Sequence, residues 1–431
     1  MFLPPLRCAK FVTVMALTGA AASAQVGPLS FDTVIRTAAR DHPLVEGARA
    51  RLLAAEASRR AASALPNPVA TYSVEDAPYP GGSQPEGLDR EVSTYLTIPL
   101  ESLYQRKPRI ERAEYEIAIA RAQLLMTRWT VIRDAARAFD RFVLARLAVE
   151  NEVDVRKGLE SLVEFNTARV REGAIAEAEL IRGQIELARA GLGETTARVE
   201  LAHAWGELRP FVPNDVPADP TAVSIAAEAQ APSIVAAPLP SFSELSDRAR
   251  SRQPELAAAR SRVEALRAEE RLQRTLTLRQ VGATFGNKRV AGQNTMIAGI
   301  SIPLPIFDRN RGEIARAAAE RIASEREFEW LDRGVTSRLR AAYDAVTMLD
   351  DQSRHLGRDL ISRAEEARSI SLAAYREGAA TLLQVIDASR TLGDVRTAYY
   401  RAVFAAREAR VALAAASGAE PDHLGPEGEV R

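Results

Sequence analysis

The chain has 431 residues, a formal net charge of zero and 26% charged residues. This balance gives no argument for nucleic-acid binding, which would need a basic patch. Ala, Arg, Glu and Leu dominate, a composition typical of long helices. The only cysteine is Cys8. Because Cys8 lies in a segment that we expect to be removed, we expect the mature chain to have no disulfide and no thiolate metal site.

Residues 1–24 are predicted to be a secretory signal peptide. Arg7 and Lys10 supply the charged region, Phe11–Leu17 the apolar region, and residues 22–24 a small-residue cleavage site. The apolar run is too short to span a bilayer. Cys8 precedes this run, whereas a lipidated cysteine would have to follow it. We therefore expect export to the periplasm or outer membrane of a Gram-negative cell.

The first half of the chain predicts a helix and a hairpin, followed by two further helices. Apolar residues recur at helical spacing over 31–64, with Pro43 marking a break near the start. Alternating runs predict strands at about 69–74 and 91–99, joined by a Pro- and Gly-rich loop over 75–90. A helix from Arg109 to about Val170, of roughly 60 residues, would be on the order of 90 Å long. Gly173 interrupts it, and a shorter helix follows over 174–208.

The second half repeats this order after a Pro- and Ala-rich segment over 210–240, which we interpret as a linker, partly ordered at best. A helix is predicted over 242–274, then strands at about 278–286 and 294–303 with a short loop over 287–294. A rod-like helix over 313–375 breaks at Gly378, and a return helix spans 381–416. Residues 419–431 are predicted to be a frayed C-terminal tail.

The two halves also match residue by residue. Pro99 in Ile98-Pro99-Leu100 corresponds to Pro303, and residues 31–43 correspond to 242–254. The segment Val170-Arg171-Glu172-Gly173-Ala174 corresponds to residues 375–379 with an offset of 205. Such self-similarity indicates an internal repeat. We therefore expect one helix–hairpin–long helix–helix unit over 25–209 and a second over 241–418.

The four predicted strands cannot close a barrel alone. After the signal peptide no segment is apolar enough for a transmembrane helix, so contact with a membrane would have to use strands. Outer-membrane barrels need at least eight strands. Three chains with four strands each would give a shared barrel of twelve strands, continuous with a tube of helices.

Two stretches resemble the TolC-like outer-membrane efflux factors, and the resemblance covers nearly the whole mature chain. They are Ile302-Pro303-Leu304-Pro305-Ile306-Phe307-Asp308-Arg309-Asn310-Arg311-Gly312 and Tyr375-Arg376-Glu377-Gly378 with residues 382–388. The first is especially similar to the CzcC-type branch, which is associated with cation efflux pumps. The resemblance implies a homotrimer, a twelve-stranded barrel in outer-membrane lipid and a helical tunnel through the periplasm. It also implies a periplasmic adaptor and an inner-membrane pump, of the resistance–nodulation–division type, as partners.

The resemblance also implies functional positions at the periplasmic end of the tunnel. Tyr375 matches an aromatic latch position, Glu179 a carboxylate of the first repeat, and Gln384 and Asp387 an inner polar ring. A bond between the Tyr375 hydroxyl and the Glu179 carboxylate would hold neighbouring helix pairs together. The family's gating arginine falls on Ala380, so the chain departs from the pattern there, with Arg376 or Arg182 as substitutes. The adaptor-contact tips implied are Arg171, Glu172, Gly173, Arg376, Glu377 and Gly378.

Other interpretations remain open at this point. Tyr375 at a helix end is ordinarily a packing residue, and Asp387 and Glu179 are ordinarily solvated helix charges. The four histidines have no metal-ligand spacing, and no catalytic or phosphate-binding motif is present, so we expect no enzyme, cofactor or bound metal. A soluble periplasmic coiled-coil or adaptor protein would explain the long helices but not two hairpins at equivalent positions. A drug-efflux or type I protein-secretion duct of the same fold would explain both.

Overall fold

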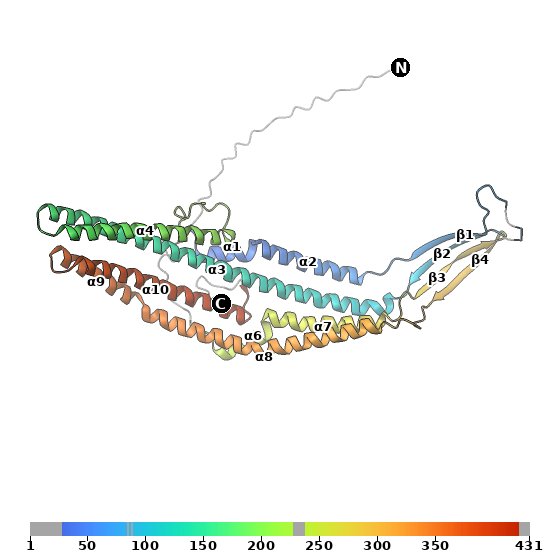
Figure 1. The fold of residues 1–431 in the computed structure, drawn as a ribbon. Helices are drawn as coiled ribbons and strands as arrows, with labels where there is room; N and C mark the ends of the chain where they lie inside the picture. Colours follow the sequence, from blue (N-terminus) through green and yellow to red (C-terminus); the bar gives the residue numbers. More distant parts are fainter. Residues whose placement is uncertain (1–27, 84–85, 88, 227–237, 422–431) are drawn as a thin grey trace, which may run out of the picture.

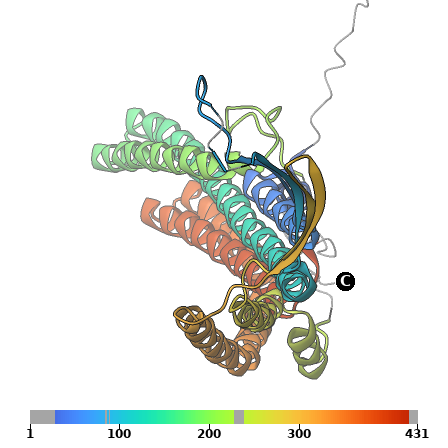
Figure 2. The ribbon, with the colours of Figure 1, turned by 90° about the vertical axis from the view of Figure 1, so that its right-hand side faces the viewer.

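The molecule is a long helical bundle with a curved β-sheet at one end and two helical hairpin tips at the other (Figures 1 and 2). The structure is a computed structural model that describes residues 28–83, 86–87, 89–226 and 238–421. The predicted signal peptide and residues 422–431 of the predicted tail lie outside the described residues. The elements in order are α1 (Phe31–Asp41), α2 (Pro43–Ser63), β1 (Val69–Glu75), β2 (Glu91–Pro99), α3 (Ser102–Arg171), α4 (Glu177–Leu208), η1 (Arg209–Phe211), α6 (Phe242–Arg252), α7 (Pro254–Thr275), β3 (Gly282–Val290), β4 (Gln293–Ser301), α8 (Arg311–Leu356), α9 (Arg358–Arg376) and α10 (Leu382–Ala416).

The helix predicted over 31–64 is divided at His42, one residue before the proline that predicted the break. His42 has an extended backbone, and its Nδ1 accepts the N–H of Leu44 at 3.2 Å, which caps α2. Pro43 then occupies the first helical position, where its missing N–H costs nothing. The two short helices pack along α3, so this half of the rod is three helices thick.

The helix α3 is the spine of the molecule. Its 70 residues correspond to a length of about 105 Å. It begins at Ser102 rather than at the predicted Arg109, and Pro108 lies inside its second turn. A proline there cannot donate to the carbonyl of Tyr104, but the rest of the first two turns forms normally. The sequence analysis started the helix after Pro108, whereas the helix contains Pro108 near its N-terminal end.

The main core lies midway along the bundle, where α1, α3, α4 and α10 meet. Phe139 and Phe142 of α3 are fully buried there. Part of the predicted linker belongs to this core. Val223 and Ile225 are buried, and Ile225 forms a parallel bridge with Leu29. Residues 212–226 of the predicted linker are therefore packed against the core, because Val212 and Val216 are also buried. Residues 227–237 lie outside the described part.

The four strands form one antiparallel sheet in the order β1-β2-β3-β4. The predicted loop over 287–294 is wrong: β3 continues to Val290, and the turn is the pair Ala291–Gly292, with φ of 49° and 79°. Positive φ at both positions is the signature of a type I′ hairpin turn. Gly286 and Asn287 resemble turn residues in the sequence, but pairing along the full length of β2 keeps them in the strand.

The long helix predicted over 313–375 is also divided. The helix α8 ends at Leu356, and α9 begins at Arg358 after Gly357, whose ψ of −179° leaves the helical region. A single glycine inside a helical pattern is a weak sequence signal, since many helices tolerate one. Among the described residues, no helix combines the length and hydrophobicity that would let it cross a membrane.

Candidate functional site: two helical tips and a two-faced sheet

The two tips have the same backbone geometry. Gly173 ends α3 with φ of 73°, and Gly378 ends α9 with φ of 80°. In each tip the N–H of the residue after the glycine donates to the carbonyl five residues earlier, at 2.8 Å. This Schellman motif requires the left-handed backbone that glycine adopts without strain. All six residues predicted as adaptor-contact tips are exposed: Arg171, Glu172, Gly173, Arg376, Glu377 and Gly378.

The helices that leave the tips begin differently. At α10, Thr381 accepts the N–H of Gln384, and the Gln384 side chain accepts the N–H of Thr381 at 2.8 Å, which makes a capping box. At α4 the equivalent Ala176 offers no side-chain cap. Gln384, predicted to belong to an inner polar ring, is therefore occupied in fixing the start of α10.

Tyr375 is buried, and its hydroxyl donates to Oδ1 of Asn166 at 2.8 Å. Asn166 lies on α3 and has no exposed surface, so the bond joins α9 of one hairpin to α3 of the other. The expected bond from Tyr375 to Glu179 is absent from the described chain. Glu179 is half exposed and pairs with Arg182 at 3.9 Å. The hydroxyl hydrogen goes to Asn166 because Asn166 is the polar group buried beside it.

Asn166 is a residue that the sequence analysis missed. Leu159, Leu162 and Asn166 share one face of α3 at spacings of three and four. A polar residue in an apolar stripe is the signal that could have found it, because burial makes such a residue seek a partner. The stripe packs in a small core together with Tyr375, Leu382, Val385 and Ile386.

Asp387 is exposed on the first turns of α10, and the described residues offer it no ion-pair partner within 4.0 Å. Ala380, at the position of the family's arginine, is partly buried against the same small core as Tyr375. Arg376 is exposed at the second tip. The structure thus brings Tyr375 and Ala380 together and leaves Asp387 and Glu179 facing outward.

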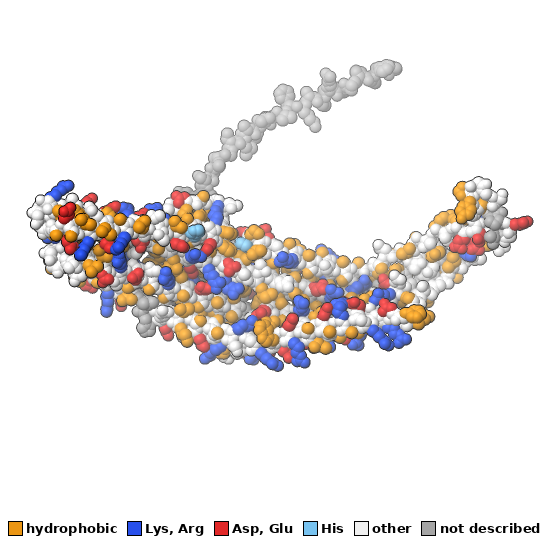
Figure 3. Space-filling model, in the orientation of Figure 1, with side chains coloured by type: hydrophobic (Ala, Val, Ile, Leu, Met, Phe, Trp, Pro, Cys, Tyr) orange, Lys and Arg blue, Asp and Glu red, His pale blue; other side chains and the backbone are white. Residues whose placement is uncertain are grey.

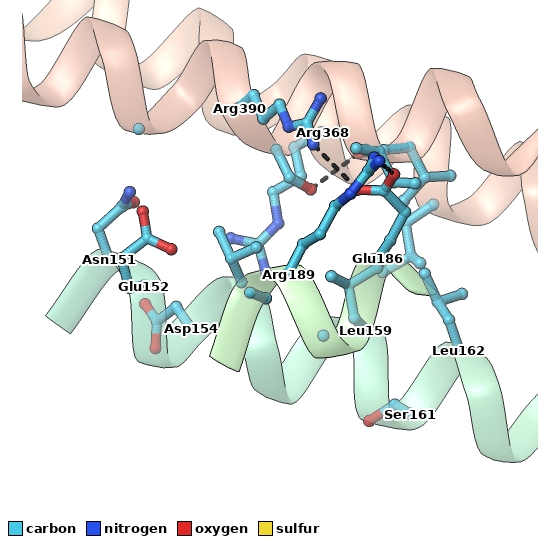
Figure 4. A pocket seen from close by; sticks show the side chains of 18 of the residues that line it. Asn151, Glu152, Asp154, Leu159, Ser161, Leu162, Glu186, Arg189, Arg368 and Arg390 are labelled. Atoms are coloured by element: carbon cyan, nitrogen blue, oxygen red, sulfur yellow. Dashed lines mark hydrogen bonds and ion pairs between the residues drawn. The ribbon is translucent and has the colours of Figure 1, made fainter. Parts of the chain in front are cut away.

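A groove of about 660 Å³ runs between the two tip hairpins (Figure 4). Glu186 of α4 lies at its edge and accepts from Arg189 at 2.7 Å and from Arg390 of α10 at 3.0 Å. This shared carboxylate ties the two hairpins together on the solvent side of the buried Tyr375–Asn166 bond. Arg368 and Arg376 also line the groove, and Glu152 and Asp154 lie on its α3 wall.

A second ionic contact joins α3 to α4. Glu194 of α4 accepts from Arg156 of α3 at 2.7 Å and from Arg198 on its own helix. The hydrogen bonds from Arg198 and Arg156 lower the pKa of the Glu194 carboxyl below its usual value. Charged hydrogen bonds favour the ionised form, which is the reason for the direction of the shift.

The sheet has two chemically different faces, and the pairing register defines them. Leu96 pairs with Phe285, which pairs with Ala298, so these side chains share one face. On the other face Thr97 and Thr284 are hydrogen-bonded at 3.2 Å, and Lys288 pairs with Glu91. The side that carries Leu96 and Phe285 is here called the apolar sheet face. Its apolar residues are Ala70, Tyr72, Val74, Val92, Leu96, Ile98, Ala283, Phe285, Met296, Ala298 and Ile300, and the register also puts Thr94, Asn287, Arg289 and Asn294 on it.

The apolar sheet face is the more exposed one. Phe285, Met296 and Ile300 are all more than 60% exposed, whereas Ser93 on the polar face is buried. Water-soluble sheets bury their apolar face, so this pattern is reversed. The register thus puts Val92, Leu96 and Ile98 of β2 on the same side as Met296, Ala298 and Ile300 of β4.

Comparisons with known proteins agree with this architecture. Residues 245–419 match the family model "Outer membrane efflux protein". The chain is 25% identical to the cobalt-zinc-cadmium resistance protein CzcC of Cupriavidus metallidurans over 86% of each chain. Its fold is similar to that of the outer membrane protein VceC of Vibrio cholerae, with a TM-score of 0.68, 17% identity and coverage of 90% and 96%. CusC has the same TM-score and identity, with coverage of 91% and 92%.

The family match over residues 245–419, the CzcC relative and the similar folds all support the resemblance to the TolC-like outer-membrane efflux factors. The matched family is named for efflux at the outer membrane, and CusC is described as forming a transmembrane channel. The resemblance noted in the sequence is thereby confirmed.

Proposed function

We propose that the protein is the exit duct of a tripartite efflux pump and that it conducts divalent metal cations to the outside of the cell. The single observation that carries the duct is the exposed apolar sheet face at one end of the helical rod. In water such a face would be an aggregation hazard, whereas in a bilayer it is the surface that contacts acyl chains. Figure 3 views the molecule from one side, with the sheet at the right.

The open sheet edges support a trimer. The strands β1 and β4 each have a neighbour on one side only. Unpaired backbone groups are costly in a bilayer, so the edges must meet those of other copies. Pairing β4 of one copy with β1 of the next makes a closed barrel of twelve strands from three chains, each contributing four.

The partners of the duct are a periplasmic adaptor and an inner-membrane pump of the resistance–nodulation–division type. The adaptor would dock at the two tips, where the exposed Arg-Glu-Gly turns lie at the end of the rod opposite the sheet. The metal substrate is supported by the CzcC relative, whose name specifies cobalt, zinc and cadmium resistance. The exposed Asp387 suits a cation pathway, because a ring of three carboxylates attracts cations.

Deletion of the gene tests the proposal. Loss of the duct should raise sensitivity to zinc, cobalt and cadmium more than to dyes and antibiotics, and the parent gene should restore resistance. Arg171→Glu with Arg376→Glu should restore it poorly, because both charges at the tips are reversed. The matched control is Arg326→Glu with Arg333→Glu on the exposed side of α8, which should complement fully. Sensitivity to drugs alone, or a defect in protein secretion, would assign the duct to another substrate class.

A further inference from the structure

The junction between the sheet and the helical rod exposes large apolar side chains that the sheet does not contain. Phe307 is 99% exposed, Leu103 80% and Leu304 73%. Together with Leu278, which is 41% exposed, they belong to three segments that meet at the junction, residues 100–108, 276–281 and 302–312, here called the junction collar. Hydrophobic side chains gather where the rod meets the sheet, next to Lys and Arg side chains (Figure 3).

The junction collar is a built structure. Asn310 is buried with φ of 53°, and its Nδ2 donates to the Gln273 carbonyl at 2.7 Å. Its Oδ1 accepts from Arg279 at 2.6 Å. Asp308 accepts the N–H of Asn310 at 2.8 Å, which forms an Asx turn. Because Asn310 is fixed inward by these bonds, the apolar residues Leu304 and Phe307 before it are held outward.

The other two segments are fastened to the same place. The Tyr104 hydroxyl donates to the Leu278 carbonyl at 2.7 Å, and Glu101 accepts the N–H of Gln280 at 3.1 Å. Thr277 donates to the Arg309 carbonyl. The exposed apolar side chains of three distant parts of the sequence are therefore displayed by one connected framework.

The charge of the junction collar is strongly positive. Its three segments contain five arginines and lysines but only two acidic residues, and both acidic residues accept backbone N–H groups. Arg309 and Arg311 are exposed, and within the described chain neither has a carboxylate within 4.0 Å. An apolar surface rimmed by unpaired cations matches an anionic lipid interface, where acyl chains and headgroup phosphates lie side by side.

We propose that the junction collar binds the anionic phospholipids of the periplasmic membrane leaflet, with Leu304 and Phe307 among the acyl chains and Arg309 and Arg311 on the headgroup phosphates. The inference rests on the proposed outer-membrane duct, and it adds a lipid-specific contact that fixes the depth of the channel. Continuity argues for lipid over a protein partner. Ile300 of the apolar sheet face is followed directly by the exposed Ile302 and Leu304, so one apolar surface crosses from the sheet into the junction collar.

A spin label measures the depth. The chain offers one cysteine, in the predicted signal peptide, so Phe307→Cys and Leu192→Cys, at another exposed apolar position on α4, can be labelled singly. In vesicles of equimolar phosphatidylethanolamine and phosphatidylglycerol, oxygen should relax the label at 307 more strongly than a water-soluble nickel chelate does. The label at 192 should be relaxed more strongly by the nickel chelate than by oxygen.

The lipid preference is tested separately by titrating phosphatidylglycerol into the detergent-purified protein and counting bound lipids by native mass spectrometry. Arg309→Gln with Arg311→Gln should weaken binding by roughly five-fold for each arginine removed, since a basic residue at a lipid surface contributes about that factor. Arg326→Gln with Arg333→Gln on α8 should leave it unchanged, and phosphatidylcholine should bind the parent more weakly than phosphatidylglycerol.

The outcomes separate this proposal from the duct itself. If the protein inserts and conducts ions while the label at 307 reports water, the lipid contact of the junction collar is contradicted. The proposed duct is unaffected by that result. Protection of the label from both reagents would mean burial against another protein copy and would also overturn it. If the double Gln variants of Arg309 with Arg311 and of Arg326 with Arg333 lost lipid binding equally, the proposed contact with the headgroups would be contradicted. A protein that does not insert at all overturns both proposals.

Discussion

The Tyr375 hydroxyl and Oδ1 of Asn166 lie 2.8 Å apart in the buried contact between the two tip hairpins, although 209 residues separate them in the chain. The Nδ2 of Asn166 is buried without a hydrogen-bond partner. A buried amide with one of its groups unsatisfied is costly to retain, so the remaining bond matters more than an exposed one would. This pair is therefore the strongest candidate for a latch between the hairpins.

Tyr375→Phe removes the only side-chain hydrogen bond that the described residues give Tyr375 and Asn166. It should destabilise the tip by about 1–3 kcal/mol, because a buried amide then has no partner. Loosened hairpins should raise single-channel conductance in planar bilayers. Adding Asn166→Leu should recover most of the thermal stability, since replacing both partners by apolar groups is nearly neutral.

Glu179→Ala is the control for this latch. Its carboxylate is half exposed and contacts only Arg182, and such pairs contribute little. Conductance equal to that of the parent is expected. If Glu179→Ala opens the channel and Tyr375→Phe does not, the latch is a contact between chains instead of the bond to Asn166.

Gly286→Ala should block assembly of the sheet. A Cβ at this position would lie 2.3 Å from the Thr94 carbonyl oxygen and 2.4 Å from Cβ of Tyr95. Both neighbours are fixed by the strand pairing, so the two strands would have to separate. Gly299→Ala, on the neighbouring strand, meets nothing within 4 Å and should be tolerated. The heat-modifiable oligomer recovered from outer membranes checks both, and equal yields would contradict the close approach.

Acid should weaken the contact between α3 and α4. The pKa of Glu194 is lowered by hydrogen bonds from Arg198 and Arg156. A folded-state pKa below the unfolded one means that the stabilisation is complete above the usual carboxyl value of 4.5 and is lost as the pH falls through the lowered value. Thermal melts should show a shallower loss of stability below that pH for Glu194→Gln than for the parent. If the thermal stability of both proteins fell equally with pH, the ionised Glu194 would contribute nothing to stability.

Asp387→Asn should reduce the cation preference of the duct. Three carboxylates at one level of a narrow tunnel attract cations, and the amide removes that field without changing the shape. Reversal potentials in asymmetric potassium chloride should shift toward zero, and block by multivalent cations should weaken. Asp215→Asn is the control, since Asp215 is an exposed carboxylate that follows η1, after the end of α4 that lies away from the tips. A shift of equal size in both variants would show that Asp387 does not line the pathway.

Much of the architecture could be predicted because it depends on local patterns of residues. The strand alternation, the left-handed glycines at 173 and 378, and the repeated helix–hairpin order depend on neighbouring residues only. The misplaced boundaries have one cause. Gly286, Asn287 and Pro108 carry turn or start signals, and each was overridden by pairing or packing with a distant segment.

The sequence by itself determined the long-helix class, the two hairpins and the turn chemistry of the tips, since each rests on residues within a few positions of one another. Only the tertiary structure decided that Tyr375 bonds Asn166 rather than Glu179, that residues 212–226 pack in the core, and that Asn310 holds the apolar loop outward. These contacts join residues that are far apart in the chain. Which distant groups meet depends on the packing of whole helices, and burial then makes the nearest polar group the partner.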